Sequence, residues 1–462
     1  MAYDYEVTVI GGGPGGYVAA IAAAQAGKRT CLVEKNKLGG TCLNEGCIPT
    51  KTMVKSAELF SEMKEAEQFG IIGTDADKLA ADLKKIKARK DTIVKKLVGG
   101  VAGLLAGNGV KVLQGSAAFQ DAHSILIDGK TAVSSEYFIL ATGSEAVIPK
   151  MITQEGNCSV ITSREALDME KLPEKLAILG GGVIGIEFAY VFSRFGCEVT
   201  VLEMMDRILP MLDREVSALV QKKLEKSGVQ FYLGASVKRI RENSILFEQN
   251  GEEKTVKAQM TLMAAGRKPY TEGLAPEKAG LELDRAAVVS DEKMQSNVPN
   301  IYVIGDVNGR SMLAHTAFHE AETAVKNICG GNSCMRYDRI PSCVYIDPEV
   351  GSIGLTEEEA REKYGDHIKV GRFPAFANGR SMVEGDTDGM FKVITDDQYG
   401  EILGVHLFGK FAAELIVQAA IAMEAEATAE ELIETVFPHP TVGEGLGEAF
   451  LSAWKGRALH SL

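Results

Sequence analysis

Tryptophan is nearly absent, with one residue in 462, and basic residues are in the minority. The 50 Lys and Arg against 63 Asp and Glu give a formal net charge of −13, so we expect no nucleic-acid partner, which would need a basic surface. No apolar run reaches the ~18–20 residues that span a bilayer, so no membrane span is expected. The polar start Met1–Glu6 lacks the basic and apolar regions of a signal peptide. Eight cysteines are too few for a secreted disulfide scaffold, which leaves a cytoplasmic globular protein of roughly three domains.

Glycine, by contrast, is abundant, with 49 residues, and some of it forms a motif near the N-terminus. The β-type run Val7–Ile10 precedes the cluster Gly11–Gly16. An alanine-rich helical stretch, Tyr17–Ala26, follows, and a second apolar run, Thr30–Val33, ends at Glu34. This order of strand, glycine turn, helix, strand and acid predicts a βαβ dinucleotide-binding unit.

The same motif occurs a second time in the chain. The run Leu176–Leu179 precedes Gly180–Gly185, a helix extends to about Phe195, and the run Val199–Leu202 ends at Glu203. The first glycines and the acids of the two motifs are separated by the same 169 residues. Two βαβ units in matching register predict two dinucleotide sites on one chain. The alternative is a pair of glycine turns in α/β domains that bind no nucleotide.

Each residue type in the motif has a physical purpose. The first glycine allows a tight turn, the second leaves room for a pyrophosphate, and the third lets helix and strand pack closely, while the acid accepts hydrogen bonds from the ribose hydroxyls. Because Glu203 would repel a 2′-phosphate, the second site favours NAD over NADP, although Arg207 lies close by in the sequence. The candidate nucleotide-binding residues are Gly11, Gly13, Gly16, Glu34, Gly180, Gly182, Gly185 and Glu203.

The rest of the chain indicates two further segments. A strand-like run, Ile301–Ile304, leads to Gly305 and Asp306, and beyond Tyr337 strand-like stretches are followed by a long helical run. We therefore expect an α/β fold with two Rossmann-like domains and a C-terminal α+β domain. The expected boundaries are 1–148 and 149–270 for the two dinucleotide-binding domains, 271–337 for a central domain and 338–462 for the C-terminal domain.

Two cysteines, Cys42 and Cys47, lie just beyond the first acid, at the expected mouth of the first nucleotide site. At a distorted helix start, two cysteines at this spacing can close a small disulfide that exchanges with substrate thiols, because a helix N-terminus stabilises the thiolate. The other interpretations are a zinc site, for which no further Cys or His stands nearby, and two buried thiols. Cys329 and Cys334 have the same spacing but follow no nucleotide loop, so we interpret them as incidental.

Two other patterns are ambiguous. Residues 78–96 contain eight basic side chains, concentrated in Lys84–Lys90, which predict either a solvated helix face or a docking site for an acidic partner. His315 and His319 are four residues apart on an expected helix, but no Cys or Asp at a suitable spacing supports a metal site, and none is predicted.

Taken together, these motifs resemble those of the pyridine nucleotide–disulfide oxidoreductases over essentially the whole chain. The stretch from Gly39 to Lys51 (GGTCLNEGCIPTK) and the C-terminal stretch His439–Glu444 (HPTVGE) carry the resemblance most specifically. The resemblance implies FAD in the first site and NAD in the second, and a homodimer formed through the C-terminal domain. It also implies cofactor contacts at Thr142, Gly143, Gly266, Asp306 and Ala314.

The resemblance also implies catalytic roles. Cys47 would be the thiol next to the flavin and Cys42 the thiol that exchanges with substrate. Lys51 would lie by the flavin and pair with Glu187, where an ammonium stabilises negative charge. His439 would be the general base, supplied by the partner subunit and oriented by Glu444.

The implied activity is oxidation of a dihydrolipoyl group by NAD+. The group would arrive on another chain, such as a lipoylated acyltransferase of a 2-oxo acid dehydrogenase or the carrier protein of glycine cleavage. A glutathione-type reductase is the alternative enzyme, and a flavin-bearing redox sensor without turnover is the alternative outside catalysis.

Overall fold

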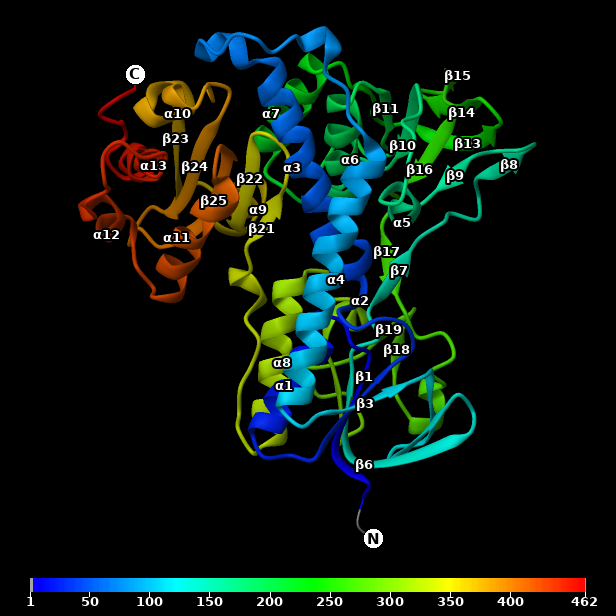
Figure 1. Cartoon of the computed structure of the whole chain (residues 1–462). Coiled ribbons are helices and arrows are strands. Elements are labelled where there is room, and N and C mark those ends of the chain that lie inside the picture. Colours follow the sequence, from blue (N-terminus) through cyan, green and yellow to red (C-terminus); the bar gives the residue numbers. More distant parts are fainter. Residues whose placement is uncertain (1–2, 462) are drawn as a thin grey trace.

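Apolar runs that alternate with glycine-initiated helices form two parallel sheets of the nucleotide-binding type. The computed structural model also contains a C-terminal antiparallel sheet of five strands (Figure 1). The structure describes residues 3–461. The expected fold class, two Rossmann-like domains and a C-terminal α+β domain, is confirmed.

The first domain is completed by a strand from far along the chain. Strand β20 (Ile301–Val303) pairs in parallel with β6 (Thr131–Leu140), so the expected central segment 271–337 contributes to the first sheet. The parallel part of this sheet has the order β3-β2-β1-β6-β20, and a hairpin extends it. Its other strands are β1 (Tyr5–Ile10), β2 (Thr30–Glu34), β3 (Lys111–Gln114), β4 (Ala117–Asp121) and β5 (Ser124–Ile127). The helices are α1 (Pro14–Gln25), α2 (Gly40–Glu45), α3 (Cys47–Lys64), α4 (Leu83–Gly107) and α8 (Ala314–Ile328), and a small ribbon joins β18 (Leu283–Asp284) to β19 (Ala287–Val288).

The second domain repeats the arrangement. Its parallel sheet has the order β12-β11-β10-β16-β9, and the four-stranded sheet β15-β14-β13-β8 lies beside it. Two antiparallel strands, β7 (Ser144–Ala146) and β17 (Arg267–Pro269), carry the chain into and out of this domain. Its remaining strands are β8 (Thr153–Glu155), β9 (Val160–Ile161), β10 (Lys175–Leu179), β11 (Glu198–Leu202), β12 (Gln230–Tyr232), β13 (Ser236–Arg241), β14 (Ser244–Gln249), β15 (Glu252–Lys257) and β16 (Met260–Met263), with helices α5 (Ser163–Ala166), α6 (Val183–Arg194) and α7 (Arg214–Lys226).

The C-terminal domain is an antiparallel sheet of order β21-β22-β25-β24-β23 with helices packed against it. The strands are β21 (Ser342–Val344), β22 (Glu349–Gly354), β23 (Ile368–Pro374), β24 (Met390–Asp396) and β25 (Ile402–Gly409). The helices are α9 (Glu357–Tyr364), α10 (Gly379–Val383), α11 (Ala412–Glu424), α12 (Ala429–Glu434) and α13 (Glu444–Lys455).

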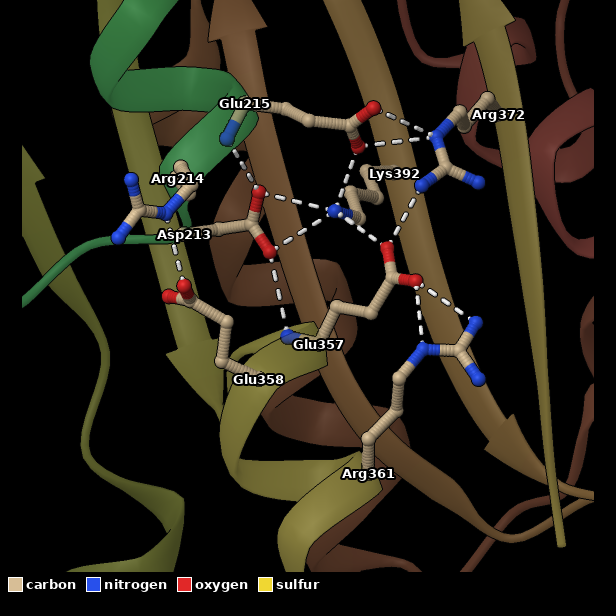
Figure 2. Close-up of a pocket in the computed structure, with 8 residues that line it drawn as sticks. All are labelled: Asp213, Arg214, Glu215, Glu357, Glu358, Arg361, Arg372 and Lys392. Atoms are coloured by element: carbon tan, nitrogen blue, oxygen red, sulfur yellow. Dashed lines mark hydrogen bonds and ion pairs between the residues drawn. The ribbon is translucent and has the colours of Figure 1, made fainter. Parts of the chain in front are cut away.

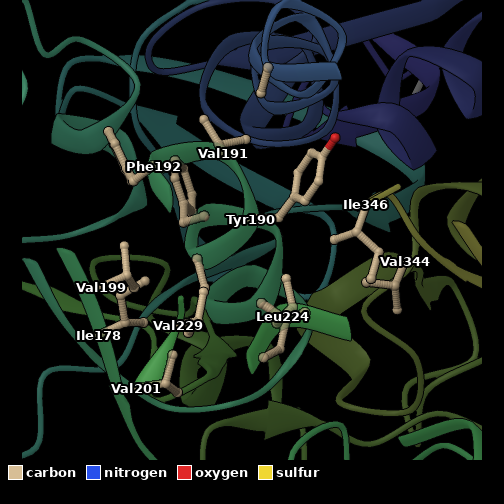
Figure 3. Close-up of a cluster of buried hydrophobic side chains, with 14 of the residues drawn as sticks. Ile178, Tyr190, Val191, Phe192, Val199, Val201, Leu224, Val229, Val344 and Ile346 are labelled. Carbon is tan, nitrogen blue, oxygen red and sulfur yellow. The ribbon is translucent and has the colours of Figure 1, made fainter. Parts of the chain in front are cut away.

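A buried apolar cluster around α6 joins the domains (Figure 3). Tyr190 and Phe192 of α6 are fully buried, because this helix is apolar nearly all round and packs on several sides. Val344 and Ile346 of the C-terminal domain enter the same cluster, as does Phe60 of α3. Each large apolar side chain buried in this way contributes about 1.5–3 kcal/mol, so the cluster strongly favours one arrangement of the domains.

An ionic cluster makes a second contact between the same domains (Figure 2). The ammonium of Lys392 on β24, whose side chain is 2% exposed, lies 2.9 Å from Asp213, 2.5 Å from Glu215 and 2.8 Å from Glu357. Asp213 and Glu215 belong to the second domain, and Glu357 begins α9. Arg372 bonds both glutamates. Since a buried charge without a partner is costly, moving the two domains apart would cost free energy, and the cluster therefore favours their observed relative position.

The basic run lies mostly on α4, and most of its side chains are exposed, as a solvated helix face would be, but Lys90 is an exception. Lys90 is buried and contacts Asp168 at 2.5 Å and Asp91 at 2.9 Å. Lys87 contacts Asp91 at 2.8 Å. The expectation of a solvated face is therefore wrong for Lys90, because Asp168, 78 residues further along, packs against it. In residues 3–461 no helix combines the length and hydropathy needed to cross a bilayer.

Candidate active site

The two glycine loops have the same geometry. Added Cβ atoms at Gly16 and Gly185 would lie 1.8 and 2.0 Å from the carbonyl oxygens of Gly11 and Gly180, so each helix meets its own turn too closely for a side chain. Gly11 and Gly180 themselves have positive φ angles of 105° and 112°, which favour glycine. The first and third glycines of each motif are thus required by the turn itself.

The second glycine of each loop faces open space. An added Cβ at Gly182 would have no neighbour within 4 Å, and at Gly13 the nearest atom would be 3.9 Å away. Both glycines precede the first residue of a helix, α1 or α6, where unpaired N–H groups attract anions. This open, electropositive space fits a dinucleotide pyrophosphate at both loops.

The two acids hold the loops in a way that the motif did not indicate. Glu34 accepts hydrogen bonds from the N–H of Gly12 at 2.7 Å and of Asn36 at 2.6 Å. Glu203 accepts the equivalent bonds from Gly181 at 2.5 Å and Met205 at 2.7 Å. Each carboxylate is therefore fixed at the end of its strand by its own backbone, in addition to any bond with a ribose.

Arg207, which could have favoured a 2′-phosphate, has other partners. Its guanidinium contacts Glu358 of α9 at 3.1 Å and the carbonyl of Pro210 at 3.0 Å. The loop after Glu203 is therefore tied to the C-terminal domain, and the observation favours NAD.

The remaining residues that the resemblance assigned to the cofactor lie along the junction of the first two domains. Thr142 donates to the carbonyl of Tyr270 at 2.6 Å, and Gly143 and Gly266 both face open space with positive φ. Asp306 accepts a hydrogen bond from Ser144, which in turn accepts one from Arg267 at 2.8 Å. Ala314 is the first residue of α8.

Sequence reasoning missed Glu320, which holds the loop that carries Asp306. Glu320 is fully buried and accepts bonds from the N–H of Gly305, the amide of Asn308 at 3.0 Å and the hydroxyl of Tyr337 at 2.6 Å. Burial raises the pKa of this carboxyl, and its donors oppose that shift. The available signal was a glutamate at a position of α8 that faces the core, because a buried carboxylate needs hydrogen-bond donors around it.

A break between two helices brings the cysteines together. Helix α2 ends at Glu45, the backbone of Gly46 is not helical, and α3 begins at Cys47. Within residues 3–461 all cysteines are free thiols, so the expected disulfide is not formed here. The two thiols lie close enough to change each other's ionisation. The neighbouring Cys42 thiol, assisted by Lys51 and opposed by burial, lowers the pKa of the Cys47 thiol to about 7, and the same pairing raises the pKa of Cys42.

Lys51 and Glu187 meet beside this pair, although they are 136 residues apart. The Lys51 ammonium lies 2.8 and 2.9 Å from the two carboxylate oxygens of Glu187, whose side chain is 4% exposed. Glu187 lies on α6 and Lys51 on α3, one turn beyond Cys47. The ammonium is therefore held where it stabilises a thiolate.

His439 and Glu444 also meet, but elsewhere. Nδ1 of His439 lies 2.9 Å from Glu444, and the N–H of Thr441 donates to the same carboxylate at 2.8 Å. Burial opposes ionisation of Glu444, but these two partners lower its pKa. The imidazole is 79% exposed, and within residues 3–461 it is bonded to neither Cys42 nor Cys47. Helix α13, which follows it, lies on the outer side of the C-terminal domain, away from α2 (Figure 1).

The other cysteines and histidines lie outside this arrangement. Cys31 and Cys197 are buried, and burial raises the pKa of each to about 12. Cys329 and Cys334 are exposed. His315 contacts the carbonyl of Pro341 at 2.7 Å.

Comparison with known proteins shows where this architecture occurs. The family model described as pyridine nucleotide-disulphide oxidoreductase matches residues 5–321, and the dimerisation domain of that family matches residues 340–450. A dihydrolipoyl dehydrogenase of Thermus scotoductus is 42% identical, with 99% of each chain aligned. One from Bacillus subtilis is 38% identical over 98% of this chain and all of its own.

Solved structures give a consistent result. The HOCl-induced flavoprotein disulfide reductase RclA from Escherichia coli superposes with a TM-score of 0.85 at 31% identity, over 96% of this chain and 99% of its own. Two family models and full-length relatives thus agree with the paired glycine loops and the cysteine pair. The chain is a member of the pyridine nucleotide-disulphide oxidoreductase family.

Proposed function

We propose that this chain oxidises dihydrolipoyl groups with NAD+, the activity of a dihydrolipoyl dehydrogenase. The observation that carries the proposal is the cysteine pair at the start of α3, with the Lys51–Glu187 ion pair beside it. The first nucleotide loop packs against the start of α2, and the second precedes α6, the helix that carries Glu187. Full-length relatives at 37–42% identity are dihydrolipoyl dehydrogenases, which supports this substrate over others.

The family uses FAD and NAD, and the residues present fit both. Gly11, Gly13, Gly16, Glu34 and Asp306 would hold FAD, while Gly180, Gly182, Gly185 and Glu203 would hold NAD. When bound, FAD supplies an acceptor for the electron pair of the dithiol, and NAD+ carries that pair away as hydride.

The chain's own part of the reaction is thiol–disulfide exchange. In the oxidised enzyme, one thiolate of the substrate attacks the sulfur of Cys42, which forms a mixed disulfide and releases Cys47 as a thiolate. The second substrate thiolate then attacks the substrate sulfur of the mixed disulfide, which closes the lipoyl disulfide and releases Cys42. Two substrate thiols are oxidised and one protein disulfide is reduced. Cys47 is the better leaving group, because its pKa lies near 7 with Lys51 beside it.

His439 would take the proton from the substrate thiol. Glu444 orients the ring through Nδ1, which leaves Nε2 to act as the base. Since His439 contacts neither cysteine of its own chain, we propose that it serves the cysteine pair of a second copy. The match to the dimerisation domain supports a homodimer in which this arrangement is possible.

The substrate would be the lipoyl group of another protein. We propose a lipoylated acyltransferase of a 2-oxo acid dehydrogenase, or the carrier protein of glycine cleavage, as the partner. We also propose that the protein acts in the cytoplasm, since the exposed thiols of Cys329 and Cys334 suit a reducing compartment.

Steady-state NADH formation from free dihydrolipoamide and NAD+ tests the proposal. We expect Cys42→Ser to abolish turnover and the control Cys334→Ser to leave it unchanged. Faster turnover of glutathione disulfide with NADPH would favour a glutathione-type reductase. The similarity to RclA supports a flavoprotein disulfide reductase in general and does not point to glutathione. A protein with bound flavin that turns over neither substrate would indicate a redox sensor.

A further inference from the structure

We propose that Tyr345 is a positioning residue that holds the Lys51 ammonium beside the redox cysteines. The inference deepens the proposed function and rests on it. Tyr345 follows β21 in the C-terminal domain, outside both nucleotide loops. The Lys51–Glu187 ion pair joins the first and second domains, and Tyr345 adds a contact from the C-terminal domain.

The backbone of Tyr345 contacts the acid of the ion pair. Its N–H donates to Oε1 of Glu187 at 3.0 Å, the same oxygen that accepts from Lys51 at 2.8 Å. Glu187 is therefore held by three donor contacts, one from the backbone of Tyr345 and two from Lys51. A carboxylate bound in this way cannot turn without breaking a contact to another domain.

The ring of Tyr345 contacts the base of the ion pair. The ammonium of Lys51 lies 4.5 Å from the ring centroid, within the range of a cation–π interaction. Lys51 has four flexible methylenes, and its side chain is 31% exposed. Glu187 holds the ammonium through its carboxylate, and the ring of Tyr345 adds a second, independent contact.

The alternation of the chain makes this position rigid. Val344 and Ile346 are 1% and 3% exposed and pack into the apolar cluster around α6 (Figure 3). In an extended segment neighbouring side chains point in opposite directions, so Tyr345 is turned away from that cluster and toward Lys51. The burial of Val344 and Ile346 therefore fixes the direction of the Tyr345 ring.

Several charged groups besides Lys51 act on Cys47. Cys42 faces it from α2, Glu187 from α6 and Arg267 from β17. Cys343 and Glu349 face Tyr345 itself. A substitution at Tyr345 leaves all of these groups in place. A change in the pKa of Cys47 that requires Lys51 therefore reports on the contact between Lys51 and the Tyr345 ring.

The experiment measures the pH dependence of Cys47 alkylation. Holoenzyme reduced with dithiothreitol is treated with iodoacetamide from pH 5 to pH 9, and the modified cysteine is identified by peptide mass spectrometry. We expect Tyr345→Leu to raise the midpoint by about half a pH unit, since a partly exposed cation–π contact has about that magnitude. Tyr345→Phe, which keeps the ring, should leave the midpoint unchanged.

A double-mutant cycle shows whether the effect passes through Lys51. Lys51→Met should raise the midpoint by itself, and adding Tyr345→Leu should then change nothing further. The matched control is Tyr364→Leu, which removes a ring 5.0 Å from Lys363 on α9 and should leave the midpoint in place. If Tyr345→Leu does not fold, Tyr345→Met replaces it in the same cycle.

Two outcomes would overturn the proposal. One is a folded Tyr345→Leu protein with the wild-type midpoint, and the other is a shift of equal size with and without Lys51. Failure of the proposed function would look different, because the wild-type protein would then form no NADH from dihydrolipoamide while its alkylation profile stayed readable.

Discussion

Two inactive variants of this chain should restore each other's activity if His439 serves the cysteine pair of a second copy, as proposed above. The imidazole is 79% exposed, and its partner within the chain is Glu444. The perturbation is Cys42→Ser in one copy and His439→Gln in the other. Loss of a general base costs on the order of 100- to 10,000-fold in rate, so each variant alone is essentially inactive.

The expected recovery follows from the composition of the sites. In a hybrid dimer one site combines both changes, and the other combines an intact Cys42 with an intact His439. Random pairing makes about half of the dimers hybrid, so a one-to-one mixture should regain about a quarter of the wild-type activity. Hybrids purified through two different affinity tags should regain about half.

The assay is NADH formation from dihydrolipoamide after co-expression of the two variants. A mixture of His439→Gln with Glu444→Gln is the control. Both changes lie on the same chain segment, so every site would still lack a functional base. If the purified hybrid were as inactive as its parents, each chain would have to contain a complete site, and the reasoning from exposure would be wrong.

Three other results are expected. Lys392→Met should lower the free energy of unfolding by roughly 3–5 kcal/mol in urea titrations, because three carboxylates lose their shared partner, whereas Lys226→Met, at a side chain that is 53% exposed, should have little effect. Gly182→Ala should keep the wild-type melting temperature but raise the KM for NAD+, while Gly185→Ala should destabilise the fold, since its Cβ would lie 2.0 Å from a carbonyl oxygen. Alkylation of Cys47 in the reduced protein should accelerate about tenfold from pH 6 to pH 8, because a pKa of about 7 means that the thiolate forms as the pH rises through that range. A flat profile over those pH values would contradict the lowered pKa.

The local parts of the fold were predictable because their causes are local. The glycine loops and the acids follow from turn geometry and spacing, and the structure differs mainly at element ends. Helix α1, for example, begins at Pro14 instead of Tyr17, since proline suits the first turn of a helix. The role of Glu34 and Glu203 in binding their own backbones was not visible, because it depends on how the strand end faces the loop.

The contacts between distant segments were not predictable from spacing. Lys51 and Glu187 were paired through a family resemblance, and nothing in either neighbourhood indicates the other. Lys392 stands inside an apolar strand, which signals a buried partner but does not say that Asp213 provides it, 179 residues away. Tyr345 was missed altogether, because an aromatic residue in a strand-like run is usually part of a core.

The late position of β20 has a consequence for synthesis on the ribosome. The first sheet lacks one strand until residues 301–303 have emerged, whereas all strands of the second parallel sheet lie between residues 160 and 263. The second nucleotide domain is therefore able to fold while the first still has an open edge at β6, the kind of edge that invites wrong pairing. A nascent chain halted near residue 295 would therefore expose that edge.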